Sequence, residues 1–138
     1  MEGLNLEPFA MKLHLRPTSS GAASVCEAAV LSVVKSLADK CSKENRAVIG
    51  HLKAFAQDDQ GAWMRVSAVD AKHAPSVEGG LAEALDHVHA TLNAHVLGLS
   101  SEKVEKLVME SIEEAQKDAC VEINCGGTEK CLCAHHQS

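Results

Sequence analysis

The sequence predicts an α/β (α+β) two-layer sandwich in the order β-α-β-β-β-α, with a four-stranded, largely antiparallel sheet and two helices on one face. Several segments alternate between apolar and polar side chains, which is typical of strands with one buried face. Two longer segments carry apolar stripes at three- and four-residue spacing, which is typical of amphipathic helices. With 138 residues, 46% of them hydrophobic, the chain suits one domain. Both helices must then cover one face of the sheet, and the opposite face is left open.

The first two elements are a strand and a helix. Residues 11–16 alternate strictly, and Pro17 ends this strand because it has no N–H to donate. Residues 22–41 have the apolar stripe of a helix. Ser24 and Glu27 have the spacing of a capping box, so regular helix is expected to begin slightly late.

The middle of the chain predicts a hairpin and a further strand. Strands are expected over 47–56 and 62–69. The polar link 57–61 between them ends in glycine, which is typical of a hairpin. Segment 70–80 is rich in turn-forming residues and is expected to be a loop. Residues 87–96 could be mistaken for a helix, but their strict period of two over ten residues predicts a strand.

The last regular element is a helix over 101–117, with Ser100 as its N-terminal cap. Residues 82–85 are expected to form a short helical lead-in to the preceding strand. The predicted organisation is one domain over 1–117, followed by a cysteine- and histidine-rich tail over 118–138.

The open face of the sheet collects basic and imidazole side chains. His87 and His89 lie on the same side of one strand, ~6.5–7 Å apart, so their rings can converge on one metal ion. His51 on a neighbouring strand is the candidate third ligand. The alternative is a solvated face, or one covered by a partner or a second protomer. The side chains expected on this face are Lys12, His14, Arg16, His51, Lys53, Arg65, His87, His89 and His95.

The chain has six cysteines, of which Cys26 and Cys41 fit the apolar stripe of a helix and are expected in the core. The N-terminus has neither the basic nor the apolar region of a signal peptide, so a cytoplasmic protein with reduced thiols is expected. Clustered thiols in a reducing compartment are typical of metal ligands. The candidate ligands in the tail are Cys120, Cys125, Cys131 and Cys133, assisted by His135 and His136.

The tail has few large aliphatic residues, whereas a structural zinc ion contributes ~10–16 kcal/mol to folding in small peptides. Thiolate-rich ligand sets favour zinc or copper(I), with an iron–sulfur cluster as a further alternative. Redox-active thiols, regulatory disulfides or a tail without specific chemistry remain open as other interpretations.

Composition argues against several classes of function. A net charge of −6, the absence of a Lys/Arg run and only 2% aromatic residues argue against nucleic-acid binding. The longest apolar stretch is far below the ~20 residues that cross a bilayer. The sequence contains no nucleophile–base pattern, paired-carboxylate motif or phosphate-binding glycine signature, so a catalytic assignment has no support.

Three segments resemble a known family. Residues 49–55 (IGHLKAF), 61–67 (GAWMRVS) and 92–99 (LNAHVLGL) resemble the C-terminal region of CobW-type metallochaperone GTPases. The resemblance implies a sheet-and-helix module that accompanies a GTPase delivering zinc or cobalt. The chain lacks the P-loop and the other guanine-nucleotide motifs, so GTP hydrolysis is not implied.

The leading hypothesis is therefore a small cytoplasmic, metallochaperone-like accessory protein. It would capture a soft metal ion through the thiols of the tail and pass it to a recipient protein or a GTPase partner. The alternatives are an interaction or homodimerisation module that uses the open sheet face, and a thiol-redox protein.

Overall fold

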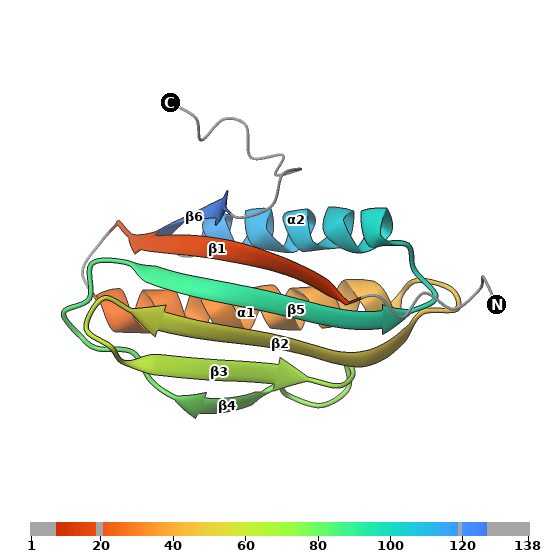
Figure 1. The fold of residues 1–138 in the computed structure, drawn as a ribbon, viewed down its shortest axis with the longest axis horizontal. Coiled ribbons are helices and arrows are strands. Elements are labelled where there is room, and N and C mark those ends of the chain that lie inside the picture. Colours follow the sequence, from red (N-terminus) through yellow and green to blue (C-terminus); the bar gives the residue numbers. More distant parts are fainter. Residues whose placement is uncertain (1–7, 19–20, 119, 127–138) are drawn as a thin grey trace.

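In the computed structural model, which describes residues 8–18, 21–118 and 120–126, two helices lie behind one six-stranded sheet (Figure 1). The strands run in the order β4-β3-β2-β5-β1-β6, and every pairing between them is antiparallel. The elements are β1 (Phe9–Pro17), α1 (Ala22–Ser42), β2 (Val48–Asp58), β3 (Trp63–Ala68), β4 (Ser76–Gly79), β5 (Val88–Leu97), α2 (Ser101–Asp118) and β6 (Val121–Gly126).

The two-layer α+β class agrees with the sequence-based prediction, but the expected four strands are too few. Strand β4 was expected to be a loop, since all four of its residues are exposed and give no alternating pattern. It is an edge strand, held by its pairing with β3. No helix forms over residues 82–85, where the chain makes a turn before β5.

Strand β6 lies in the segment that was expected to be a tail. Its side chains at Val121, Ile123 and Cys125 are buried, and its backbone pairs with β1. The Thr18 N–H extends this pairing by donating to the Cys120 carbonyl at 2.9 Å. Residues 121–126 therefore form an edge strand of the sheet, with three side chains in the core.

The core lies between the sheet and the two helices. The expected apolar stripes of both helices are buried. Helix α2 is capped by Ser100, whose Oγ accepts the Lys103 N–H at 3.1 Å, as predicted. The predicted capping box in α1 is absent: Gly21 is the N-cap, and the Glu27 carboxylate instead accepts the Leu81 N–H at 2.8 Å.

The hairpin between β2 and β3 forms as predicted, and a buried carboxylate organises it. Asp58 Oδ1 accepts the N–H groups of Gln60 at 2.8 Å and Ala62 at 3.0 Å. At the other end of β2 the register with β5 shifts between Ile49 and His51. Because of this irregularity Val48 is 58% exposed, instead of sharing the buried face of the strand.

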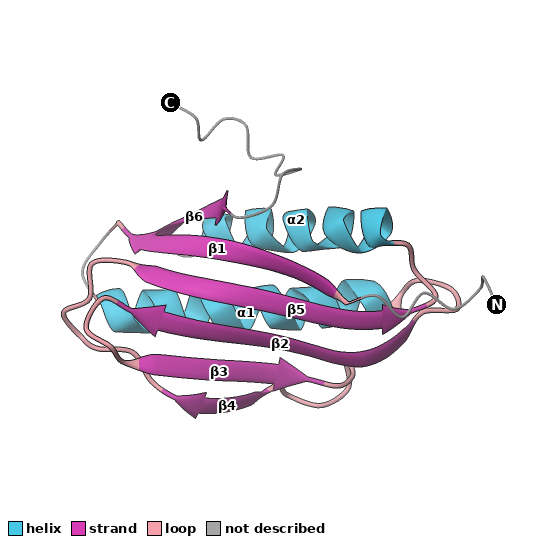
Figure 2. Ribbon diagram, viewed as in Figure 1, coloured by secondary structure: helices cyan, strands magenta, loops and turns pink. Residues whose placement is uncertain are grey.

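Both helices cover the same face of the sheet, and no described element covers the other (Figure 2). The open face carries the polar members of the alternating strands, as the sequence predicted. No helix within the described residues combines the length and apolar character needed to cross a membrane.

Candidate metal centre

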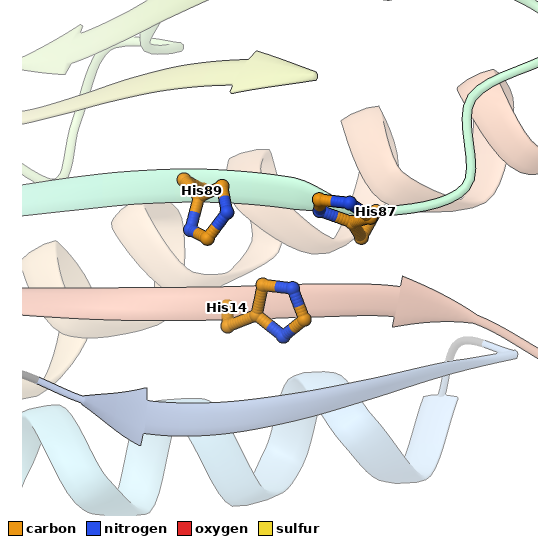
Figure 3. A group of neighbouring side chains, drawn as sticks. All are labelled: His14, His87 and His89. Carbon is orange, nitrogen blue, oxygen red and sulfur yellow. The ribbon is translucent and has the colours of Figure 1, made fainter. Parts of the chain in front are cut away.

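Three histidines meet on the open face, where β1 and β5 lie side by side (Figure 3). His14 of β1 pairs directly with His89 of β5, and His87 lies one residue before β5. One nitrogen from each ring can be chosen so that all three lie within 4.8 Å of one another. We call these three residues the trihistidine site.

The rings of the trihistidine site are close together, but their nitrogens are farther apart than those of histidines bound to one metal ion. The His14 ring centroid lies 4.8 Å from that of His89 and 5.1 Å from that of His87. Nitrogens bound to a tetrahedral zinc at about 2.0–2.1 Å are themselves roughly 3.3 Å apart. Since the outer torsion of histidine is soft, small ring rotations can close this gap.

The local sequence explains two of the three positions. His14 lies between buried Leu13 and Leu15, so the alternation of the strand turns its ring to the open face. The same alternation applies to His89, which lies between buried Val88 and Ala90.

His87 lies outside the regular strand and is positioned by its backbone. Asp59 Oδ1 accepts the N–H of Asp86 at 2.8 Å and that of His87 at 3.2 Å. These donors, Asp86 first and His87 second, hold the pKa of the Asp59 carboxyl below its usual value. The carboxylate therefore fixes the start of the segment that carries two candidate ligands.

The imidazole of His87 also has a ring nitrogen without a hydrogen-bond partner among the described residues. Its Nδ1 is buried and has no hydrogen-bond partner among the residues that the structure describes. Buried nitrogen atoms in folded proteins nearly always have a partner, because leaving one unpaired costs ~1–3 kcal/mol. A bound cation is one partner that fits an imidazole nitrogen.

The electrostatic environment favours the neutral form of the His14 ring. The pKa of His14 is lowered from its ordinary value of 6.5, first by partial burial and then by the proximity of His89, His87 and Arg16. A neutral imidazole has a lone pair free for a metal ion, whereas an imidazolium has none. His14 is therefore available as a ligand at neutral pH.

Two surface depressions adjoin the site. One, of about 590 Å³, is lined in part by His14, His87, Arg16 and Asp86. The other, of about 320 Å³, adjoins His89 and includes Lys12 in its lining. A ligand bound beside the three rings would therefore contact charged side chains of β1.

His51, the expected third ligand, does not join His87 and His89. It stacks instead on His95, with ring centroids 4.4 Å apart and an interplanar angle of 22°. Gln57, not His51, faces His89 across β2 and β5. His51 and Gln57 are six positions apart along β2, which corresponds to about 20 Å, so His14 takes the place predicted for His51.

The thiols expected as ligands have different locations. Cys125 is only 3% exposed and its Sγ donates to Met109 Sδ at 3.7 Å, so it faces the core, whereas Cys120 is exposed. Their gathering around one ion stays a prediction, because the other four expected ligands lie outside the described residues. These four are Cys131, Cys133, His135 and His136.

The two helical cysteines are core residues, as expected. Cys26 and Cys41 are fully buried, and burial is the main cause that raises the pKa of each thiol to about 11. Such thiols are protonated at neutral pH, so they are poor metal ligands and poor redox nucleophiles.

No protein-family model matches the chain, and neither the curated proteins nor the solved structures include a significant match to it. The resemblance to CobW-type C-terminal regions therefore stays a hypothesis based on three short segments.

Proposed function

We propose that the protein binds an exchangeable transition-metal ion at His14, His87 and His89. The observation that carries this proposal is the convergence of three imidazoles from two strands, with one buried nitrogen that has no partner among the described residues. Three imidazoles that leave one position open are a ligand set found in zinc sites.

The ligand type narrows the choice of metal. Imidazole nitrogen suits zinc(II), copper(II), nickel(II) and cobalt(II), whereas copper(I) and iron–sulfur clusters favour thiolates. Zinc(II) is our first candidate, because it accepts four-coordinate geometry without a redox change. The copper(I) and iron–sulfur alternatives depend on the tail thiols and are secondary.

The site has the character of an exchangeable site more than of a structural one. Histidine ligands of tight metal sites donate their second ring nitrogen to a carboxylate or a carbonyl group. None of the three rings makes such a hydrogen bond to a described residue, and His89 is exposed. We therefore propose a metal-handling accessory role, in which a recipient protein displaces the imidazoles and the tail thiols form a second ligand set.

Zinc binding by matched variants tests the proposal. To remove competing thiols, Cys120, Cys131 and Cys133 are replaced by serine; we call this chain the serine variant. We expect it to bind one zinc ion in equilibrium dialysis, and His14→Ala to abolish that binding. His51→Ala is the matched control and should bind like the parent.

Two results would count against the trihistidine site. Equal zinc binding by the serine variant with and without His14→Ala would exclude it. Loss of all zinc binding in the serine variant itself would return the thiolate cluster to first place.

One specific observation favours a second candidate, an interaction surface on the same open face. Phe55 and Trp63 are 38% and 39% exposed and stack with ring centroids 6.0 Å apart. Arg65 lies over the Trp63 ring at 5.5 Å. Under this alternative, charge reversal at Lys53 and Arg65 would dissociate an oligomer seen by light scattering, whereas a monomeric parent chain would argue against self-association.

A further inference from the structure

The trihistidine site provides three ligands and leaves a coordination position to be filled. Within the described residues, no carboxylate or thiol joins the three imidazoles to within 4.8 Å. The sheet itself closes one side of the site, because the strand residues next to the ligands (Leu13, Leu15, Val88 and Ala90) are buried in the core. A fourth ligand must therefore approach from the open face.

Arg16 lies beside the open side of the trihistidine site. It is two residues from His14 on the same face of β1, and it lines the depression of about 590 Å³ together with His14 and His87.

The guanidinium of Arg16 has no carboxylate partner in the described part of the chain. Glu122 of β6 is its register partner, and Asp86 lines the same depression. The ion pairs of the described residues include neither of these carboxylates with Arg16. By contrast, Arg65 on the same face is paired with Glu78 at 2.6 Å.

Charge and shape together define the ligand that fits. The charges of a divalent ion, Arg16 and Lys12 together outweigh the three carboxylates nearby (Asp59, Asp86 and Glu122), so the site would attract an anion. A guanidinium presents parallel N–H donors that match the two oxygens of a carboxylate. One carboxylate oxygen can then bind the metal while the other accepts from Arg16.

We propose that the trihistidine site takes a small carboxylate as its exchangeable fourth ligand, held between the metal ion and Arg16. This inference rests on the proposed metal site. It gives the site a class of small-molecule ligand in addition to the metal, and it assigns Arg16 as the residue that selects an anion over a neutral ligand.

Cobalt(II) makes the fourth ligand visible, because its absorption spectrum changes when a ligand is exchanged. The serine variant is loaded with cobalt(II) and titrated with acetate at constant pH and ionic strength. Neutral imidazole serves as a second probe that binds the metal without needing Arg16. We expect both probes to change the spectrum.

The Arg16→Gln variant supplies the decisive comparison. Losing a charge-assisted hydrogen bond should weaken acetate binding about tenfold and leave imidazole binding unchanged. Arg65→Gln is the matched control, since it removes a guanidinium of the same face that already has a partner, and it should bind acetate like the parent.

The outcomes separate this inference from the metal site. Equal acetate affinity in the parent and Arg16→Gln, with a normal cobalt spectrum, overturns the role of Arg16 and leaves the trihistidine site standing. A cobalt spectrum that acetate does not change overturns the carboxylate ligand. A serine variant without any cobalt spectrum overturns both proposals.

Discussion

The carboxylate of Asp59 accepts the backbone N–H of His87 at 3.2 Å, across a separation of 28 residues in the sequence. The hairpin between β2 and β3 is thereby tied to the segment that leads into β5. Because the same oxygen also accepts the Asp86 N–H at 2.8 Å, two consecutive backbone groups are fixed beside the trihistidine site. This contact positions a candidate metal ligand without touching its ring.

Replacing Asp59 with alanine should therefore weaken metal binding while preserving the fold. Outer contacts that orient metal ligands are worth ~10–100-fold in affinity, and we expect a loss near tenfold here because the contact is to the backbone. Zinc titration of the serine variant with and without Asp59→Ala measures the effect. Circular dichroism checks that the secondary structure is unchanged.

Asp70 offers a matched control for Asp59. It also lies in a loop and accepts two backbone N–H groups, from Lys72 at 3.0 Å and His73 at 2.9 Å. Asp70→Ala should leave zinc affinity unchanged, because His73 is not in the trihistidine site. Equal losses in the two variants would mean that Asp59 has no special role at the site.

Much of the fold could be predicted because each main element carries its own periodic pattern. The ten-residue alternation of β5 and the apolar stripes of both helices indicate structure without any knowledge of neighbouring elements. Strand β4 could not be found in this way, since all four of its residues are exposed and give no alternating pattern. Strand β6 is short, and Cys125 within it and Cys120 just before it favoured a metal-binding interpretation over burial.

The candidate site could be predicted only in part. Sequence alternation places His14, His51, His87 and His89 on one face, but it does not give the order or the register of the strands. Both β1 and β2 are neighbours of β5, so either could have supplied the third imidazole. The register of the strands determines which histidine joins the site, because His14 is opposite His89, whereas His51 is opposite His95. These pairings join residues far apart in the chain, and local periodicity does not report them.

The buried thiols of α1 should make the fold less stable in alkaline solution. Burial raises the pKa of Cys26 and Cys41 from 9.0 to about 11, so the folded chain keeps protons that the unfolded chain releases in this range. The free energy of unfolding should then fall as pH rises from about 9 to about 11. One pKa unit corresponds to ~1.4 kcal/mol, so the pair can contribute a few kcal/mol.

Urea unfolding at several pH values measures this effect. The double variant Cys26→Ala, Cys41→Ala is the reference, because it lacks both titrating groups while every other group stays. We expect a steeper decline above pH 9 in the parent than in the variant. Parallel declines would show that these thiols are not protected from ionisation by the fold.

Two glycines with similar backbone angles should respond differently to alanine. Gly61 has φ +91° and Gly98 has φ +93°, a region that alanine adopts only with a strain of ~1–2 kcal/mol. A methyl group at Gly98 would in addition overlap the carbonyl oxygen of Arg46, whereas the space around Gly61 is open. Urea unfolding should show a clearly larger loss of stability for Gly98→Ala than for Gly61→Ala, and similar losses would contradict the close approach of Gly98 to the Arg46 carbonyl.

Thiol reactivity should distinguish the described cysteines. In a chain with Cys131→Ser and Cys133→Ser, one thiol, the exposed Cys120, should react rapidly with an alkylating reagent. The three buried thiols should react only after urea is added, because none of them is more than 3% exposed. Mass spectrometry counts the adducts, and rapid modification of Cys125 would contradict the burial of β6 against the helices.

X-ray absorption at the zinc edge tests the central claim most directly, since it reports the atoms bound to the metal. The serine variant is loaded with one equivalent of zinc, and the spectrum is compared with that of the same chain carrying His51→Ala. We expect both to show three imidazole ligands and a fourth ligand with an oxygen or nitrogen donor atom. A first shell with fewer than three imidazoles in the parent, or one that changes in the His51→Ala chain, would contradict the site formed by His14, His87 and His89.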